Sequence, residues 1–175
     1  MIETRLWTTD GFVYDDPWRS IGEEETPPAT DTNVRLLVSL AHYRELTEHN
    51  RRSGRIGVLL SPDDDVAQLE PHLENLSLIA VSFPAFSDGR AYSQASLLRD
   101  RLGFYGELRA VGDVLIDQIP LMLRCGIDSF VVSNQAAIRR LSEGRLPGIS
   151  AQYQPSATPS RATGSYAWRH AQEHS

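Results

Sequence analysis

Short apolar runs rich in β-branched residues alternate, over residues 34–146, with segments whose apolar residues recur at helical spacing. Each run has the length of one buried strand, and each periodic segment has the length of a helix. The expected strands are Val34–Leu40, Ile56–Leu60, Leu76–Phe83, Glu107–Val111 and Ile127–Val132, and the expected helices lie near His42–Arg51, Asp63–Glu74, Gly89–Leu102, Asp113–Cys125 and Gln135–Glu143.

This alternation predicts an α/β fold of repeated βα units with a mainly parallel sheet of about five strands, because parallel neighbours need a crossover connection. Nearly continuous apolar runs such as LIAVSF at residues 78–83 agree with strands covered on both faces. Five strands are too few for a closed eight-stranded barrel. The sheet is therefore expected to be open, either doubly wound or a half-barrel that a homodimer completes, and the pattern is compatible with both.

Composition divides the chain into three parts. Four aromatic residues within 7–18 surround an Asp10–Gly11 turn signal, which predicts a hairpin or an arm that packs its aromatics on the core. The acidic, proline-bearing residues 20–33 are expected to form a mobile loop, and the Pro-, Ser- and Ala-rich C-terminal residues a disordered tail. The expected parts are an arm and loop over 1–33, an α/β domain over 34–146 and a tail over 147–175.

Charge and cysteine content exclude several classes of function. A formal net charge of -6 argues against a general binder of nucleic acids or anionic membranes. The sequence has neither an apolar run of membrane-spanning length nor a secretion signal, so we expect a cytoplasmic protein. The single cysteine, Cys125, excludes an intramolecular disulfide, and all 17 basic residues are arginine, which excludes lysine Schiff-base chemistry and a Walker lysine.

Polar residues gather where the expected strands end and the helices begin. Helix N-termini at these exits favour an anion, and Arg90 and Arg109 would add bidentate donors. Alternatively, Arg90 pairs with Asp88 and Arg109 with Asp113 simply to close the turns. The candidate site residues are Asp88 and Asp113 as acid or base, and Ser87, Arg90, Arg109, Asp117, Gln118 and Arg124 as groups that bind a substrate or anion.

The helices around these residues are expected to carry polar stripes. Asp113, Asp117 and Arg124 would share one stripe, and Pro120 is expected to kink that helix. On the preceding helix, the spacing predicts that Arg99 lies on the surface.

Three further constellations have ordinary explanations that we favour. The run Ser61–Asp65 resembles a cation site but also a helix start capped by Ser61. His42, Glu45 and His49 share a helix face without further ligands, so no metal site is expected. Cys125 follows a helix C-terminus and is expected to be a small buried hydrophobe rather than a nucleophile.

Three blocks carry a resemblance to a known family: FSDGRAYSQASLLRDRLG at 86–103, GELRAVGDVLIDQ at 106–118 and RCGIDSF at 124–130. They resemble an uncharacterised bacterial domain-of-unknown-function family, often labelled an oxidoreductase involved in sulfite reduction and encoded beside assimilatory sulfite reductase. The chain departs from the family's aromatic-rich stretch after Gln118 by carrying Ile119–Leu121.

The resemblance implies a role in assimilatory sulfate reduction without identifying catalytic residues. The leading hypothesis is an accessory or anion-binding protein that handles a sulfur oxyanion or nucleotide phosphate, or docks on sulfite reductase. The alternative is an enzyme, an oxidoreductase acting on an anionic substrate, and a third hypothesis is a structural subunit. No intrinsic cofactor is expected, because the sequence has no cysteine cluster and no dinucleotide-binding glycine loop.

Overall fold

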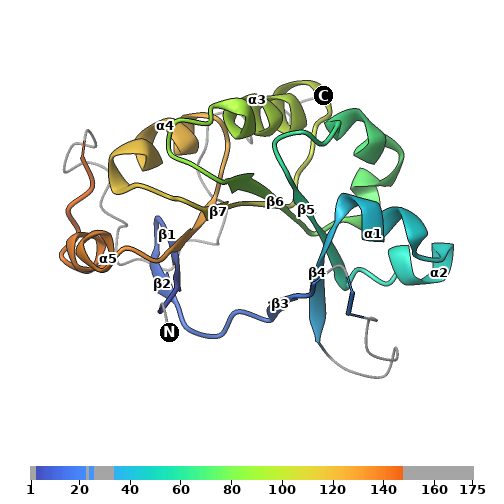
Figure 1. The fold of residues 1–175 in the computed structure, drawn as a ribbon, viewed down its shortest axis with the longest axis horizontal. Helices are drawn as coiled ribbons and strands as arrows, with labels where there is room; N and C mark the ends of the chain where they lie inside the picture. Colours follow the sequence, from blue (N-terminus) through green and yellow to red (C-terminus); the bar gives the residue numbers. More distant parts are fainter. Residues whose placement is uncertain (1–2, 23, 26–33, 148–175) are drawn as a thin grey trace, which may run out of the picture.

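An eight-stranded, mostly parallel sheet curls into an open half-barrel in the computed structural model, which describes residues 3–22, 24–25 and 34–147 (Figure 1). The strands are β1 (Arg5–Thr8), β2 (Gly11–Val13), β3 (Trp18–Ser20), β4 (Arg35–Ser39), β5 (Ile56–Leu60), β6 (Leu78–Phe83), β7 (Glu107–Gly112) and β8 (Ser129–Val132). The helices are α1 (Leu40–Glu45), α2 (Glu48–Arg51), α3 (Arg90–Ser96), α4 (Ile119–Arg124) and α5 (Gln135–Ser142), with 3₁₀ helices η1 (Val66–Asn75) and η3 (Ile116–Gln118) and a π-helix η2 (Leu97–Arg101).

Strand order decides between the two expected architectures. Strands β3 to β8 lie side by side in sequence order and are parallel throughout. Because every right-handed crossover then steps in the same direction, the helices collect on one side of the sheet, as Figure 1 shows. The α/β prediction is confirmed, and the sheet is a half-barrel rather than doubly wound. The five expected strands correspond to β4–β8, and three N-terminal strands extend the sheet.

The N-terminal strands occupy both edges of this sheet. The predicted hairpin forms between β1 and β2, and β1 pairs antiparallel with β8. The ring of Trp7 is buried and lies 5.8 Å from that of Phe130. At the opposite edge, β3 pairs parallel with β4.

Residues 14–17, the strap, therefore connect opposite edges of the sheet (Figure 1). Eight flat strands about 4.8 Å apart would separate the edges by about 34 Å. The five residue steps from Val13 to Trp18 extend to about 18 Å at most. A flat sheet is thus impossible with this connection, and the strap runs across the concave side as a chord.

Alternating side chains divide the core between the two faces. The convex face packs under the helices and includes Val58, Ile79, Val81 and Phe130. A small second cluster on the concave face contains Leu37, Leu78 and Ala80, with Trp18 packed against it. Gly57 is required beneath Trp18, because a Cβ there would lie 2.9 Å from the Leu78 carbonyl oxygen and 3.1 Å from the Trp18 ring.

Several helices differ from their predicted extents. The segment His42–Arg51 forms two short helices rather than one, and the expected helix from Asp113 begins only at Ile116. Pro120 lies in the first turn of α4, where no backbone donor is needed, so the predicted kink is absent. The predictions for residues 26–33 and 148–175 concern residues outside the described part. Within that part, no helix combines the length and apolar character needed to cross a membrane.

Candidate functional site

Side chains join three consecutive loops at the carboxyl ends of β5, β6 and β7. We call residues 61–65, 84–90 and 112–118 the loop edge. Most of the predicted site residues lie here, so the prediction that strand exits concentrate polar groups holds for these loops. The contacts they make are mainly with one another.

Arg90 connects the first loop to the second. Its Nη1 donates to Asp63 at 2.5 Å, and its Nε and Nη2 donate to the two Asp88 oxygens at 3.0 and 2.7 Å. The Asp88 carboxylate also accepts from the Arg90 backbone N–H. These bonds hold the pKa of Asp88 below its usual range. Arg90 is therefore neutralised by two carboxylates at the start of α3.

Asp113 and Gln118 connect the second loop to the third through the backbone of Phe86. The Phe86 N–H donates to Asp113 Oδ2 at 3.0 Å, and Gln118 Nε2 donates to the Phe86 carbonyl at 2.9 Å. The Asp113 N–H also donates to the Phe83 carbonyl. Gly112 permits this approach, since it has φ +92° and a Cβ would lie 2.4 Å from the Phe83 oxygen. Both polar backbone groups of Phe86 are thus fixed by side chains.

A turn closed by the Asp88 N–H and the Ala85 carbonyl, 3.0 Å apart, carries Phe86 and Ser87 at its tip. Ser87 is exposed, and 60% of the Phe86 surface is exposed. Behind this turn, buried Gln94 donates through Nε2 to the carbonyls of Ser61 and Asp64, which braces the first loop against α3.

Asp117 and Arg124 do not join these contacts. Asp117 forms an exposed pair with Arg140 of α5 at 3.8 Å. The Nε of Arg124 lies 3.5 Å from the Pro120 carbonyl within its own helix. The predicted stripe of Asp113, Asp117 and Arg124 is not formed, because Asp113 precedes the helix.

Arg109 lies apart from the loop edge. It was predicted at a strand exit, but β7 continues to Gly112, which leaves Arg109 mid-strand and 4% exposed on the concave face. Its guanidinium donates to both oxygens of Asp16 at 2.7 and 3.1 Å and twice to Glu107 Oε1 at 3.0 and 2.9 Å. Ser129 Oγ donates to the same Glu107 oxygen at 2.6 Å. Arg90 and Arg109 therefore have separate sets of partners.

Arg99 is a second charged residue that the sequence pattern placed wrongly. It is 3% exposed and donates to the carbonyls of Gly126, Phe104 and Gly106 and to the Asp128 carboxylate. It belongs to the π-helix η2, whose wider turn moves side chains away from the positions that regular helical spacing predicts. Its partners lie in two segments, one directly after η2 and one before β8, and no local pattern marks the second.

The structure also places the three remaining groups of candidate residues, which are the run at 61–65, the two histidines and the cysteine. Asp65, rather than Ser61, caps η1 by accepting from the Ala67 N–H at 3.0 Å. His42 and His49 lie on two separate helices. Cys125 is half-buried, and burial together with this thiol raises the pKa of Tyr92. Among the described residues, no three His, Cys, Asp or Glu side chains are placed to hold a metal ion.

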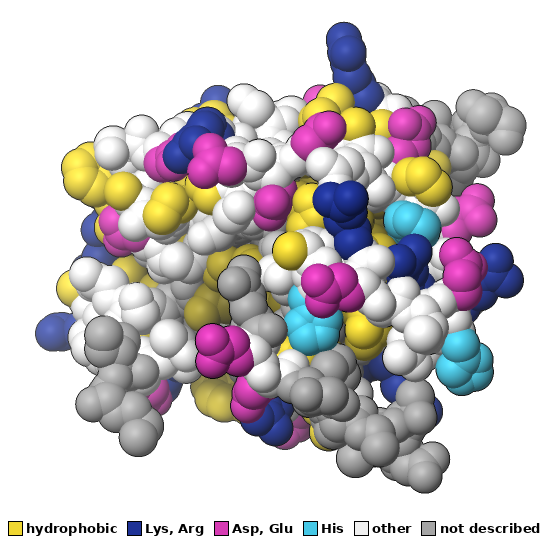
Figure 2. Space-filling view, turned by 45° about the vertical axis from the view of Figure 1, so that its right-hand side comes forward, with side chains coloured by type: hydrophobic (Ala, Val, Ile, Leu, Met, Phe, Trp, Pro, Cys, Tyr) yellow, Lys and Arg dark blue, Asp and Glu magenta, His cyan; other side chains and the backbone are white. Residues whose placement is uncertain are grey.

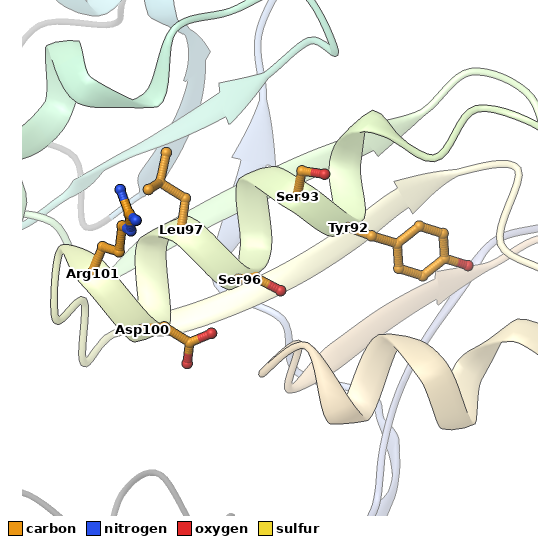
Figure 3. A pocket seen from close by; sticks show the side chains of 6 residues that line it. All are labelled: Tyr92, Ser93, Ser96, Leu97, Asp100 and Arg101. Atoms are coloured by element: carbon orange, nitrogen blue, oxygen red, sulfur yellow. The ribbon is translucent and has the colours of Figure 1, made fainter.

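Two shallow pockets lie outside the loop edge. One of about 420 Å³ follows α3 and η2, where Ser96 and Asp100 point to one side of the helix and Leu97 and Arg101 to the other (Figure 3). The other, of about 410 Å³, lies beside the strap and includes Asp16. On the face shown in Figure 2, basic and acidic side chains lie interspersed rather than in separate patches.

Comparison with known proteins identifies the family. The sequence model of the family described as "Bacterial protein of unknown function (DUF934)" matches residues 57–163, which is more than half of the chain. The chain belongs to this family. The matched range contains the whole loop edge, whereas β1 to β4 precede it. Comparisons with curated proteins and with solved structures gave no match.

Proposed function

We propose that this protein is a non-catalytic accessory partner of assimilatory sulfite reduction that binds the sulfite-reducing enzyme. The observation that carries the proposal is the mutual pairing of the candidate site residues. Arg90 binds Asp63 of the preceding loop and Asp88 of its own loop, Asp113 binds the loop before it, and Arg109 is enclosed by Asp16 and Glu107.

An enzyme that used these groups would need them to converge on one cleft. A general acid or base must reach the proton it transfers, and an oxyanion clamp needs donors free to face the substrate. Here the donors of both arginines already face carboxylates, and the two arginines share no partner. Pairs of this kind hold loops in fixed positions, as a protein-binding surface requires.

The pathway is supported by the resemblance of residues 86–130 to proteins encoded beside assimilatory sulfite reductase. An accessory protein of that pathway would act by contact with the reductase. Its effect should therefore follow the stoichiometry of a complex rather than the turnover of a catalyst.

The test is a titration of the purified protein into the cognate sulfite reductase while sulfite-dependent consumption of reductant is followed. We expect a complex on size-exclusion chromatography and an effect on rate that saturates near a stoichiometric ratio. An effect that is complete at a small fraction of the reductase concentration would indicate catalysis instead. The absence of any complex at low salt, together with no effect on rate, would overturn the proposal.

A further inference from the structure

We propose that the loop edge is the docking surface for the partner, with Phe86 as the anchoring side chain that enters an apolar pocket with a basic rim. This inference rests on the proposed function and names the surface by which it operates. It starts from an aromatic side chain that is 60% exposed although its backbone is held on both sides.

The geometry around Phe86 presents its side chain outward. Phe86 lies at the tip of the turn closed by Ala85 and Asp88, and its N–H and carbonyl are bound by Asp113 and Gln118. An unsupported surface loop would leave these backbone groups to water. Two side chains of the next loop instead fix the backbone from which one exposed ring projects.

Such fixation favours binding because little conformational freedom remains to be lost. Ordering a loop at an interface opposes association, so a loop that is already ordered binds more tightly for the same contacts. Large aromatic residues are also enriched among the few side chains that dominate binding energy. A second exposed apolar residue, Leu121, lies one helical turn beyond Gln118 and is 45% exposed.

The charges around the ring specify the partner's chemistry. Asp63, Asp64, Asp65, Asp88 and Asp113 lie in the loop edge with one basic residue, Arg90, which pairs with two of them. Asp117, the sixth aspartate, pairs with Arg140 of α5. The surface around Phe86 is therefore acidic, and the whole chain carries a formal charge of -6. Complementarity requires a partner surface with an apolar pocket surrounded by arginine or lysine.

The chain offers a matched control at the amino ends of the parallel strands, opposite the loop edge. Tyr105 is 61% exposed and precedes β7, whereas Phe86 follows β6, so the two aromatics lie at opposite ends of neighbouring parallel strands. Both side chains are more than half exposed, so both alanine variants are expected to fold. A third variant, Asp113→Ala, keeps the ring but releases the Phe86 N–H.

The experiment measures the affinity of each variant for the cognate sulfite reductase by biolayer interferometry at two salt concentrations, with thermal unfolding as the check on folding. We expect Phe86→Ala to weaken binding about 30-fold or more and Tyr105→Ala to change it less than about twofold. Asp113→Ala should weaken binding about fivefold, because it releases the Phe86 backbone and removes one negative charge from the surface. Raising the NaCl concentration from about 50 to 200 mM should weaken wild-type binding, as an acidic–basic interface requires.

The outcomes separate this inference from the function on which it rests. Equal affinities of the wild type, Phe86→Ala and Tyr105→Ala would overturn the docking surface and leave the accessory function standing. Loss of binding in Tyr105→Ala but not in Phe86→Ala would place the interface at the amino ends of the strands and would also overturn the inference. A wild-type protein that binds no reductase would overturn the accessory function and the surface with it.

Discussion

Arg109 of β7 and Asp16 of the strap form a two-bond ion pair, with Nη1 2.7 Å from Oδ2 and Nη2 3.1 Å from Oδ1. The pair joins residues 93 positions apart in the sequence and fixes the strap over the concave face. The same guanidinium also binds Glu107, so one buried cation serves two carboxylates. The N-terminal segment is thereby attached to the centre of the sheet as well as to its edges.

Replacing Arg109 by alanine is predicted to destabilise the fold by about 3–5 kcal/mol, because two carboxylates would lose a shared, buried cation. The measurement is the free energy of unfolding from urea titration. Arg52→Ala is the control, since Arg52 and Glu48 form an exposed pair that should contribute less than about 1 kcal/mol. Equal losses in the two variants would show that the Arg109 network does not stabilise the strap.

Gly126→Ala is predicted to destabilise the protein more than Gly144→Ala. Both glycines have positive φ, +92° and +70°, but a Cβ at Gly126 would lie 2.4 Å from Arg99 Cγ, whereas the space at Gly144 is open. The shared conformational strain is about 1–2 kcal/mol, and crowding against Arg99 should add about 1–3 kcal/mol at Gly126. Comparison of unfolding free energies checks this, and similar losses would mean that Arg99 moves aside freely.

Asp88 is predicted to titrate below its usual range because of its bonds to Arg90. A carboxylate with a lowered pKa in the folded state adds stability above its unfolded pKa of about 3.9, and that stability is lost as the pH falls through the lower folded value. The stability difference between the wild type and Arg90→Gln should therefore be full at pH 6, begin to fall below about pH 4 and vanish only once the pH is below the lowered pKa of Asp88. An NMR titration that places Asp88 at or above 3.9 in the wild type would contradict this.

Sulfate and sulfite are predicted to raise the melting temperature no more than chloride does at equal ionic strength, because Arg90 and Arg109 already face carboxylates. The measurement is a differential scanning fluorimetry series over the three anions. A bound oxyanion at 100 times its Kd would add about 2.7 kcal/mol, a shift of several degrees. A shift of that size would support the predicted anion site.

The central strands were predictable because their signal is local. Runs such as LIAVSF become β6 almost residue for residue, and burial on both faces follows from their continuous apolar character. The edge strands carry weaker signals, since the Asp10–Gly11 turn predicts the β1–β2 hairpin but not its pairing with β8. Trp18–Ser20 is three residues long and acquires strand geometry only by pairing with β4. Strand order, and with it the half-barrel, depends on tertiary pairing between strands that no local run predicts.

The loop edge was predictable in its location but not in its contacts. Parallel strands bring their carboxyl ends together, which placed Asp88, Arg90 and Asp113 correctly at one edge. Their partners could not be predicted, because Asp113 binds a backbone group 27 positions away. Arg99 was misplaced since a π-helix departs from the periodicity on which stripe predictions depend. The exposure of Phe86 could not be predicted either, because it depends on how the loop that carries it packs in the folded protein.

The pairing of β1 with β8 constrains the order in which the chain can fold during synthesis. The hairpin containing β1 leaves the ribosome well before its partner β8, which is made more than a hundred residues later, because Arg5 pairs with Val132. Contacts this distant in sequence close large loops and form late. A nascent chain can assemble β4 to β7 in succession, but β1 cannot pair with β8 until β8 has emerged from the ribosome. Residues that are synthesised before the central strands are therefore placed in the fold after them.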